Sequence, residues 1–160
     1  MHGTGTPLVT PFTGDGDLDE ARLAELVGWL EDRGIDFLVP AGSNGEAALM
    51  SADERARVVE VVAEAASVPV LAGTGHPGFR ETLRATDRAA DAGADGALVV
   101  TPYYYGHDQE TVAAHYRELA DAVEIPIYLY SVPAKTGFRL DPETVGELAA
   151  HPNVRGMKDS

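Results

Sequence analysis

The sequence predicts an α/β fold in which buried parallel strands alternate with helices, and its loop residues favour a (β/α)8 TIM barrel. Six short apolar segments alternate with five helical segments along the chain. The apolar segments are continuously hydrophobic, which is typical of parallel strands covered by helices. Polar and aromatic residues follow the carboxyl ends of many consecutive strands, as in a barrel, whereas a doubly wound sheet concentrates its site at one switch point.

The six predicted strands are short runs of Val, Leu, Ile and Ala, and most of them are bounded by glycine, proline or aspartate. Each is followed by a loop that leads into a helix or, for the last strand, by the end of the sequence. The strands are expected at residues 6–12, 36–41, 68–72, 96–101, 125–130 and 154–158.

The five predicted helices are placed by their capping residues. Asp19 caps the first helix, which stops at Gly34, and Ser51 with Glu54 has the spacing of a capping box at the start of the second. Asp141, followed by a proline at the first helical position, begins the fifth. The third, fourth and fifth helices are expected at residues 80–92, 109–123 and 141–150.

A complete barrel needs eight strands in roughly 250 residues, and this chain supplies six. We therefore expect residues 1–160 to be a single TIM-barrel domain that is truncated after strand six. No linker, internal duplication or low-complexity segment divides the sequence.

Composition excludes several classes of function. The formal net charge of −14 argues against a nucleic-acid or anionic membrane partner, because such surfaces bind basic proteins. There is no cysteine, no apolar run long enough to span a membrane and no signal-peptide pattern, so a cytoplasmic location is expected. The five histidines lack metal-ligand spacing, and we expect no metal and no cofactor. The acidic surface is compatible both with a salt-rich cytoplasm and with an ordinary acidic protein.

Lys158 is the residue that most strongly suggests catalysis. The chain has two lysines, Lys135 and Lys158, against ten arginines, and Lys158 lies at the end of the last predicted strand. Arginine could supply a positive charge there, but its guanidinium stays protonated and is a poor nucleophile. A lysine that is shielded from water can lose its proton and attack a carbonyl carbon to form a Schiff base. The alternative is an ordinary surface lysine in a strand-to-loop turn.

Four sequence segments, each following a strand, occur together in order: GSNGE at 42–46, TPYY at 101–104, YSVPAKTG at 130–137 and GMKD at 156–159. With these segments the chain resembles the dihydrodipicolinate synthase and N-acetylneuraminate lyase family, from Gly5 to Ser160. The resemblance implies a class I aldolase that uses pyruvate and needs no metal. It also implies a homo-oligomer, a dimer or tetramer, when the protein has its full length.

The resemblance implies catalytic roles for Lys158 and Tyr130. Lys158 matches the lysine that forms the imine with the keto carbon of pyruvate, and we expect the barrel mouth to bury it. Tyr130 matches the tyrosine that relays protons at the end of strand five. Tyr128 lies two residues earlier on the same face of the strand, and we expect it to be the core aromatic of the pair.

The GSNGE segment is implied to hold pyruvate. Ser43 matches the relay hydroxyl, and Asn44 stands where family members usually have a hydroxyl residue that helps hold the carboxylate of pyruvate. Gly42 and Gly45 are expected to let backbone N–H groups turn toward that carboxylate. The same four residues would also make a plain turn.

Tyr104 and Lys135 are the remaining site residues that the resemblance implies. Tyr104 matches a tyrosine that completes the hydroxyl relay from a neighbouring subunit, and the adjacent Tyr103 and Tyr105 suit a subunit contact. Lys135 stands where dihydrodipicolinate synthases usually carry an arginine that recognises the second substrate. Lysine keeps the charge but loses the bidentate geometry.

Three functions remain open from the sequence. The first is a pyruvate-dependent aldolase or lyase that acts on 2-oxo acids of the 4-hydroxy-2-oxoglutarate or 2-keto-3-deoxy sugar acid type, with pyruvate and a small aldehyde or 2-oxo acid as its partners. Lys135 and the residues of the last two segments, YSVPAKTG and GMKD, favour this first function. The second is dihydrodipicolinate synthase itself, which condenses pyruvate with aspartate semialdehyde. The third is a noncatalytic barrel fragment.

Overall fold

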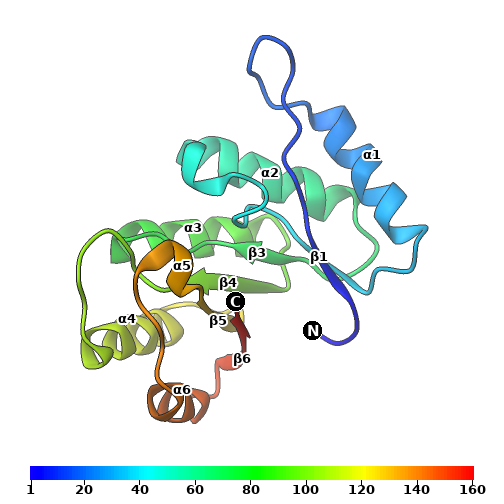
Figure 1. Cartoon of the computed structure of the whole chain (residues 1–160). Coiled ribbons are helices and arrows are strands. Elements are labelled where there is room, and N and C mark those ends of the chain that lie inside the picture. The colour runs from blue at the N-terminus through cyan, green and yellow to red at the C-terminus, as the bar shows by residue number, and fades with distance from the viewer. The chain divides into compact units, whose positions relative to one another are not determined.

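The computed structural model describes all residues 1–160 and is drawn in Figure 1. The chain forms two compact units. The first contains Met1–Gly73 and Arg88–Asp95, and the second contains Thr74–Asp87 and Gly96–Ser160. Each unit is described by itself.

The first unit is built on a small parallel sheet. Strand β1 (Gly5–Pro7) pairs in parallel with β2 (Phe37–Val39), so that Thr6 lies opposite Leu38. A single parallel bridge joins Leu38 to Val70, just before β3 (Leu71–Gly73). Helices α1 (Glu20–Glu31) and α2 (Ala52–Ala65) supply most of the other buried side chains. The core of this unit includes Leu8, Leu23, Val27, Leu38, Val58, Val62, Val70 and Ala72.

The second unit contains three consecutive parallel strands covered on one face by helices (Figure 1). The strands are β4 (Gly96–Val100), β5 (Ile127–Ser131) and β6 (Val154–Asp159), and the covering helices are α4 (Gln109–Ala122) and α6 (Pro142–Ala149). Alternate strand residues such as Val99 and Leu129 pack against α4. The fully buried hydroxyl of Tyr116 donates to the carbonyl of Val99 over 2.8 Å. The opposite face of these strands therefore carries the even-numbered residues of β4 and β5.

The capping predictions are confirmed. Asp19 accepts a hydrogen bond from the Arg22 amide at 3.1 Å, and Ser51 and Glu54 form both bonds of the capping box, at 3.2 and 2.7 Å. Asp141 does precede α6, but its side chain makes no capping hydrogen bond. Asp141 is nonetheless the N-cap residue of α6, and a proline follows it at the first helical position, as the sequence predicted.

The predicted order of elements is confirmed, with two helical turns that the sequence did not reveal. All six strands are present, although β1 ends at Pro7 and is shorter than predicted. The predicted third helix is α3 (Phe79–Asp91). The extra turns are η1 (Ala47–Leu49), a 3-10 turn, and α5 (Pro133–Thr136). The expectation of five helices was therefore too low, because a single turn has no amphipathic period to recognise.

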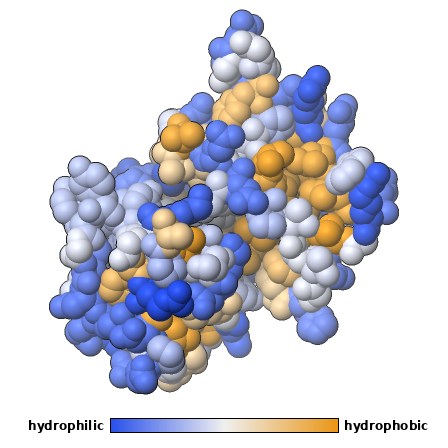
Figure 2. Space-filling view, in the orientation of Figure 1, coloured by the Kyte–Doolittle hydropathy of each residue, from blue (hydrophilic) through white to orange (hydrophobic).

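The surface is largely hydrophilic, as the charge predicts, with a few apolar patches on the face drawn in Figure 2. The most exposed large apolar side chains are Tyr104, Leu49, Tyr105, Val9 and Trp29. No helix in the structure is long and apolar enough to cross a membrane.

Candidate active site

Lys158 and Tyr130 lie side by side at the carboxyl ends of two neighbouring strands. They are register partners of the parallel β5–β6 pair, and Nζ of Lys158 lies 4.0 Å from the centroid of the Tyr130 ring. This is a cation–π geometry, in which the ring face attracts the ammonium group. A nucleophilic amine and a phenol are thus placed within reach of one small carbonyl compound.

The burial of the two tyrosines on β5 differs from the prediction. Tyr130 is buried, with 6% of its surface exposed, whereas Tyr128 is only half-buried. The prediction that Tyr128 is the core aromatic was wrong because its register partner on β6 is Gly156. A Cβ on Gly156 would lie 2.9 Å from Cδ1 of Tyr128, so the ring lies over bare backbone at the sheet surface.

The side chain of Lys158 is exposed in this chain, contrary to the expected shielding. The cause is the sheet order, in which β6 is the last strand and has β5 as its single neighbour. The lysine is therefore covered from the side of Tyr130 and open on the side away from β5.

Lys135 lies on α5, the single helical turn that follows β5, and its side chain is exposed. A proline begins this turn, and Gly137 ends it in the left-handed conformation at φ 70°. The Thr136 hydroxyl donates to the carbonyls of Val132 and Phe138, at 3.2 and 3.0 Å. These bonds tie the turn to the residues on either side of it.

Ser43 and Asn44 lie in the first unit, in the loop after β2, and both side chains are exposed. The backbone N–H of Gly45 is engaged within the loop. It donates to the carbonyl of Gly42 at 3.2 Å, within the turn itself.

The left-handed positions of this loop are Ala41 at φ 52° and Glu46 at φ 57°, and neither is a glycine. Gly45 is needed for space instead. A Cβ there would lie 3.0 Å from the Leu8 carbonyl oxygen and 3.1 Å from Oγ1 of Thr10, whose hydroxyl donates to the Gly45 carbonyl at 2.7 Å. Leu8 and Thr10 thus pack closely against the turn at Gly45, while the side chains of Ser43 and Asn44 are exposed.

Tyr104 has 86% of its surface exposed and Tyr105 has 70%. Their rings meet edge to face with centroids 5.0 Å apart, and Tyr104 adopts φ 82°, which is rare for a bulky residue. Tyr103 is half-buried. These two exposed aromatic rings after β4 are compatible with the predicted subunit contact.

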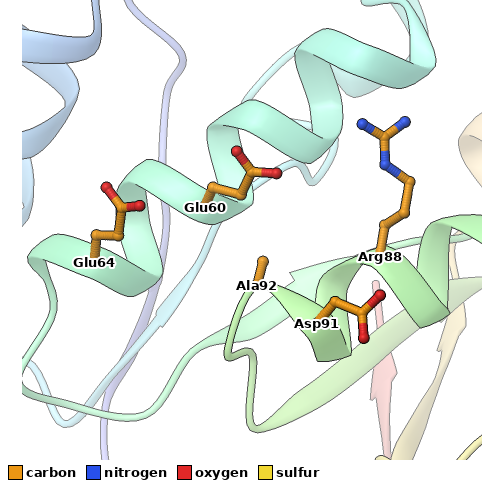
Figure 3. A pocket seen from close by; sticks show the side chains of 5 residues that line it. All are labelled: Glu60, Glu64, Arg88, Asp91 and Ala92. Atoms are coloured by element: carbon orange, nitrogen blue, oxygen red, sulfur yellow. The ribbon is translucent and has the colours of Figure 1, made fainter.

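Two cavities of the structure are lined by none of the predicted site residues. One, of about 370 Å³, lies in the first unit between α2 and the end of α3, and its lining is mostly acidic (Figure 3): Glu60, Glu64, Arg88, Asp91 and Ala92. The other, of about 420 Å³, lies in the second unit beside Phe79 and His115. Burial lowers the pKa of His115 to about 4, so this ring is neutral near pH 7. No group of three His, Cys, Asp or Glu side chains is arranged to hold a metal ion.

Comparison with known proteins identifies the family. The sequence model described as the Dihydrodipicolinate synthetase family matches residues 1–160. The chain is 45% identical over 159 residues to a 4-hydroxy-tetrahydrodipicolinate synthase of Haloarcula marismortui, which covers 99% of this chain and 52% of that protein. It is 44% identical to the protein of the same name in Geotalea uraniireducens, over 100% of this chain and 56% of that one. The chain belongs to the dihydrodipicolinate synthetase family.

Solved structures agree with this assignment. Dihydrodipicolinate synthase from Acinetobacter baumannii, in complex with pyruvate, superposes with a TM-score of 0.96 at 41% identity, over 99% of this chain and 55% of that one. YagE, a prophage protein of E. coli K12 in complex with pyruvate, gives 0.95 at 38% identity, over 98% and 54%. The fold is therefore that of the TIM-barrel enzymes of this family, present as a partial barrel, as the sequence predicted. The chain spans about half the length of the curated relatives it matches.

Proposed function

We propose that this chain carries the Schiff-base centre of a pyruvate-dependent carbon–carbon lyase. The observation that carries the proposal is the pairing of Lys158 and Tyr130, with the amine 4.0 Å from the ring centroid at two adjacent strand ends. The two family members solved in complex with pyruvate support the same substrate here.

The chemistry begins at Lys158. Its neutral amine attacks the keto carbon of pyruvate, and the resulting carbinolamine loses water to give an imine. Loss of a proton from the methyl carbon then gives an enamine, with the imine nitrogen as the electron sink. The enamine carbon attacks the acceptor carbonyl in synthesis, and the same steps in reverse cleave the bond.

Proton transfer falls to Tyr130 and Ser43. The Tyr130 hydroxyl protonates the departing carbinolamine oxygen, and Ser43 extends the relay. Tyr104 completes it from a second copy of the protein, because its ring projects into solvent in the isolated chain. The working assembly is then a homo-oligomer.

The carboxylate of pyruvate is held by the loop after β2. Asn44 donates from its side-chain amide, and Gly42 gives the ligand close access to the backbone. Gly45 contributes space instead of a donor, because its N–H is already bonded within the turn.

Lys135 recognises the acceptor. Its ammonium group, on the exposed turn after β5, can reach a carboxylate at the mouth of the site without being buried. Two substrates are candidates. The names of the relatives favour aspartate semialdehyde as the acceptor, as in the synthase. The lysine in place of the usual arginine favours cleavage of a 2-oxo acid such as 4-hydroxy-2-oxoglutarate, which already contains the pyruvate carbons and releases a small aldehyde acid.

The test is Lys158→Arg in the protein at its full natural length, assayed with both candidate substrates. Arginine keeps a cation beside Tyr130 but cannot form an imine, so turnover should fall to background while the circular dichroism spectrum is unchanged. Retention of more than about a tenth of the turnover would contradict a Schiff-base mechanism, since loss of a covalent nucleophile costs far more. No turnover with either substrate before mutation would favour the noncatalytic alternative.

A further inference from the structure

The chain segment that joins α5 to α6 can be followed in Figure 1. It is held by the side chain of Gln109, the first residue of α4. Its Nε2 donates to the carbonyl of Arg139 at 2.8 Å, and its Oε1 accepts from the amide of Asp141 at 3.2 Å. One amide side chain thus binds a donor and an acceptor two residues apart. The connector is fixed to the start of α4 at that point.

The same connector is tied to the ends of β5 and β6. The amide of Leu140 donates to Oγ of Ser131, a residue with no exposed surface, at 3.4 Å. The guanidinium of Arg139 lies 3.7 Å from the carboxylate of Asp159, which directly follows Lys158. This ion pair is exposed and adds little to stability, but it places the connector against the strand end that carries the amine.

These contacts matter because α5 cannot hold its own position. A helix of four residues has no favourable free energy of formation in isolation, so its orientation depends on the segments that enter and leave it. The chain enters α5 from β5, which is mostly buried, and leaves it through Gly137 into the connector. Without Gln109 the exit would lose its two shortest-range ties to α4 and would keep the Thr136 bonds to Phe138, the long Ser131 bond, the exposed Arg139 pair and the burial of Leu140.

We propose that Gln109 is a positioning residue that fixes the connector and thereby sets where Lys135 meets the acceptor carboxylate. The inference rests on the acceptor-binding role proposed above for Lys135. Gln109 does not touch substrate. It acts by restricting the turn that carries the lysine, so its loss lets the ammonium group spread over many positions. Such a residue affects acceptor binding and leaves the imine chemistry at Lys158 intact.

Two substitutions separate the functions of the amide. Gln109→Met keeps the length of the side chain and removes both hydrogen bonds. Gln109→Glu keeps the acceptor for the Asp141 amide, loses the donor to the Arg139 carbonyl and should have a smaller effect. Glu110→Gln is the matched control, because it alters the next residue of the same helical turn, which pairs with Arg117 and does not contact the connector.

The experiment measures KM and kcat in the full-length protein, with pyruvate plus aspartate semialdehyde and with 4-hydroxy-2-oxoglutarate. Gln109→Met should raise the KM of aspartate semialdehyde, and that of 4-hydroxy-2-oxoglutarate in the cleavage assay, by about 5- to 30-fold, the scale of one or two neutral hydrogen bonds. The pyruvate KM and the rate of borohydride trapping should stay unchanged, and Glu110→Gln should behave as wild type. Equal rises in the KM of pyruvate and acceptor would overturn the proposal. If Gln109→Met does not fold, Gln109→Glu is measured by the same criteria.

Combination with Lys135→Ala distinguishes the possible failures. If Gln109 acts through Lys135, Gln109→Met should add nothing in the Lys135→Ala background. Additive effects would show that Gln109 acts elsewhere and overturn the inference alone. The same holds if Lys135→Ala raises the acceptor KM while Gln109→Met does not. An unchanged acceptor KM in Lys135→Ala would remove the acceptor role of Lys135, and the positioning role of Gln109 with it.

Discussion

At the scale of single residues, the site depends on a phenol and an amine brought together by strand register. Parallel pairing places Tyr130 opposite Lys158, and the ring beneath the amine holds it by cation–π attraction. In the proposed mechanism, the hydroxyl at the ring edge exchanges protons with a substrate bound to the amine. Ring and hydroxyl therefore have separable functions.

Tyr130→Phe should lower turnover by about 10²- to 10⁴-fold, the range for loss of one positioned acid–base group. The ring remains, so the fold and the placement of Lys158 should be kept. Tyr116→Phe is the control for loss of a phenol hydroxyl in the same unit. Burial raises the pKa of the Tyr116 hydroxyl far above its ordinary value, and its bond to Val99 is structural. That variant should lose stability and keep its turnover. Unchanged turnover in Tyr130→Phe would remove its hydroxyl from the relay.

At the scale of elements, strands and long helices could be predicted because their signals are local. Ser51 and Glu54 marked a helix start that the structure reproduces, and continuous apolar runs marked buried strands. The one-turn elements η1 and α5 gave no such signal, because four or fewer residues show no period. The connector that follows α5 is bonded to the distant Gln109, a contact that no motif in the sequence indicated.

The candidate site was predicted as a set of positions, but not in its detail. The lysine and tyrosine at adjacent strand ends followed from the order of strands. The backbone conformation of the loop after β2 could not be predicted, because its left-handed residues are Ala41 and Glu46, where glycines would be expected. Such a conformation is imposed by packing around the turn, and the residue types of the turn alone do not reveal it.

Gly73, at the end of β3, shows how that packing operates. A Cβ at this position would lie 2.2 Å from the carbonyl oxygen of Ala41, so only glycine allows the approach. Gly73→Ala should lower the free energy of unfolding by about 1–3 kcal/mol, the cost of overpacking. Gly14→Ala is the control, since nothing lies within 4 Å of a Cβ there. Urea unfolding measures both, and similar values for the two variants would contradict the close contact.

At the scale of the whole molecule, charge is the dominant feature. The chain carries 26 acidic and 12 basic side chains, so a net repulsion between like charges opposes the folded state. Ion pairs such as Arg57 with Glu20 and Arg88 with Asp53 lie at the surface and offset little of this repulsion.

Raising NaCl from about 0.1 M to about 1 M should therefore stabilise the protein, because the screening length falls from about 10 Å to about 3 Å. Thermal unfolding should shift upward by roughly 2–4 °C for each kcal/mol gained. A variant with Glu25→Gln, Asp91→Asn and Glu124→Gln, three exposed carboxylates, should show a smaller shift. A fall in Tm with NaCl would show that the ion pairs outweigh the repulsion.

The central claim, that Lys158 forms an imine with pyruvate, is tested most directly by borohydride trapping in the full-length protein. Reduction in the presence of pyruvate should add one carboxyethyl group to Lys158 and block tryptic cleavage after it, as peptide mass spectrometry would show. Lys135 is the other lysine in this sequence and serves as an internal control, so it should remain unmodified. Modification of Lys135 with Lys158 untouched, or no modification of either residue, would contradict the mechanism.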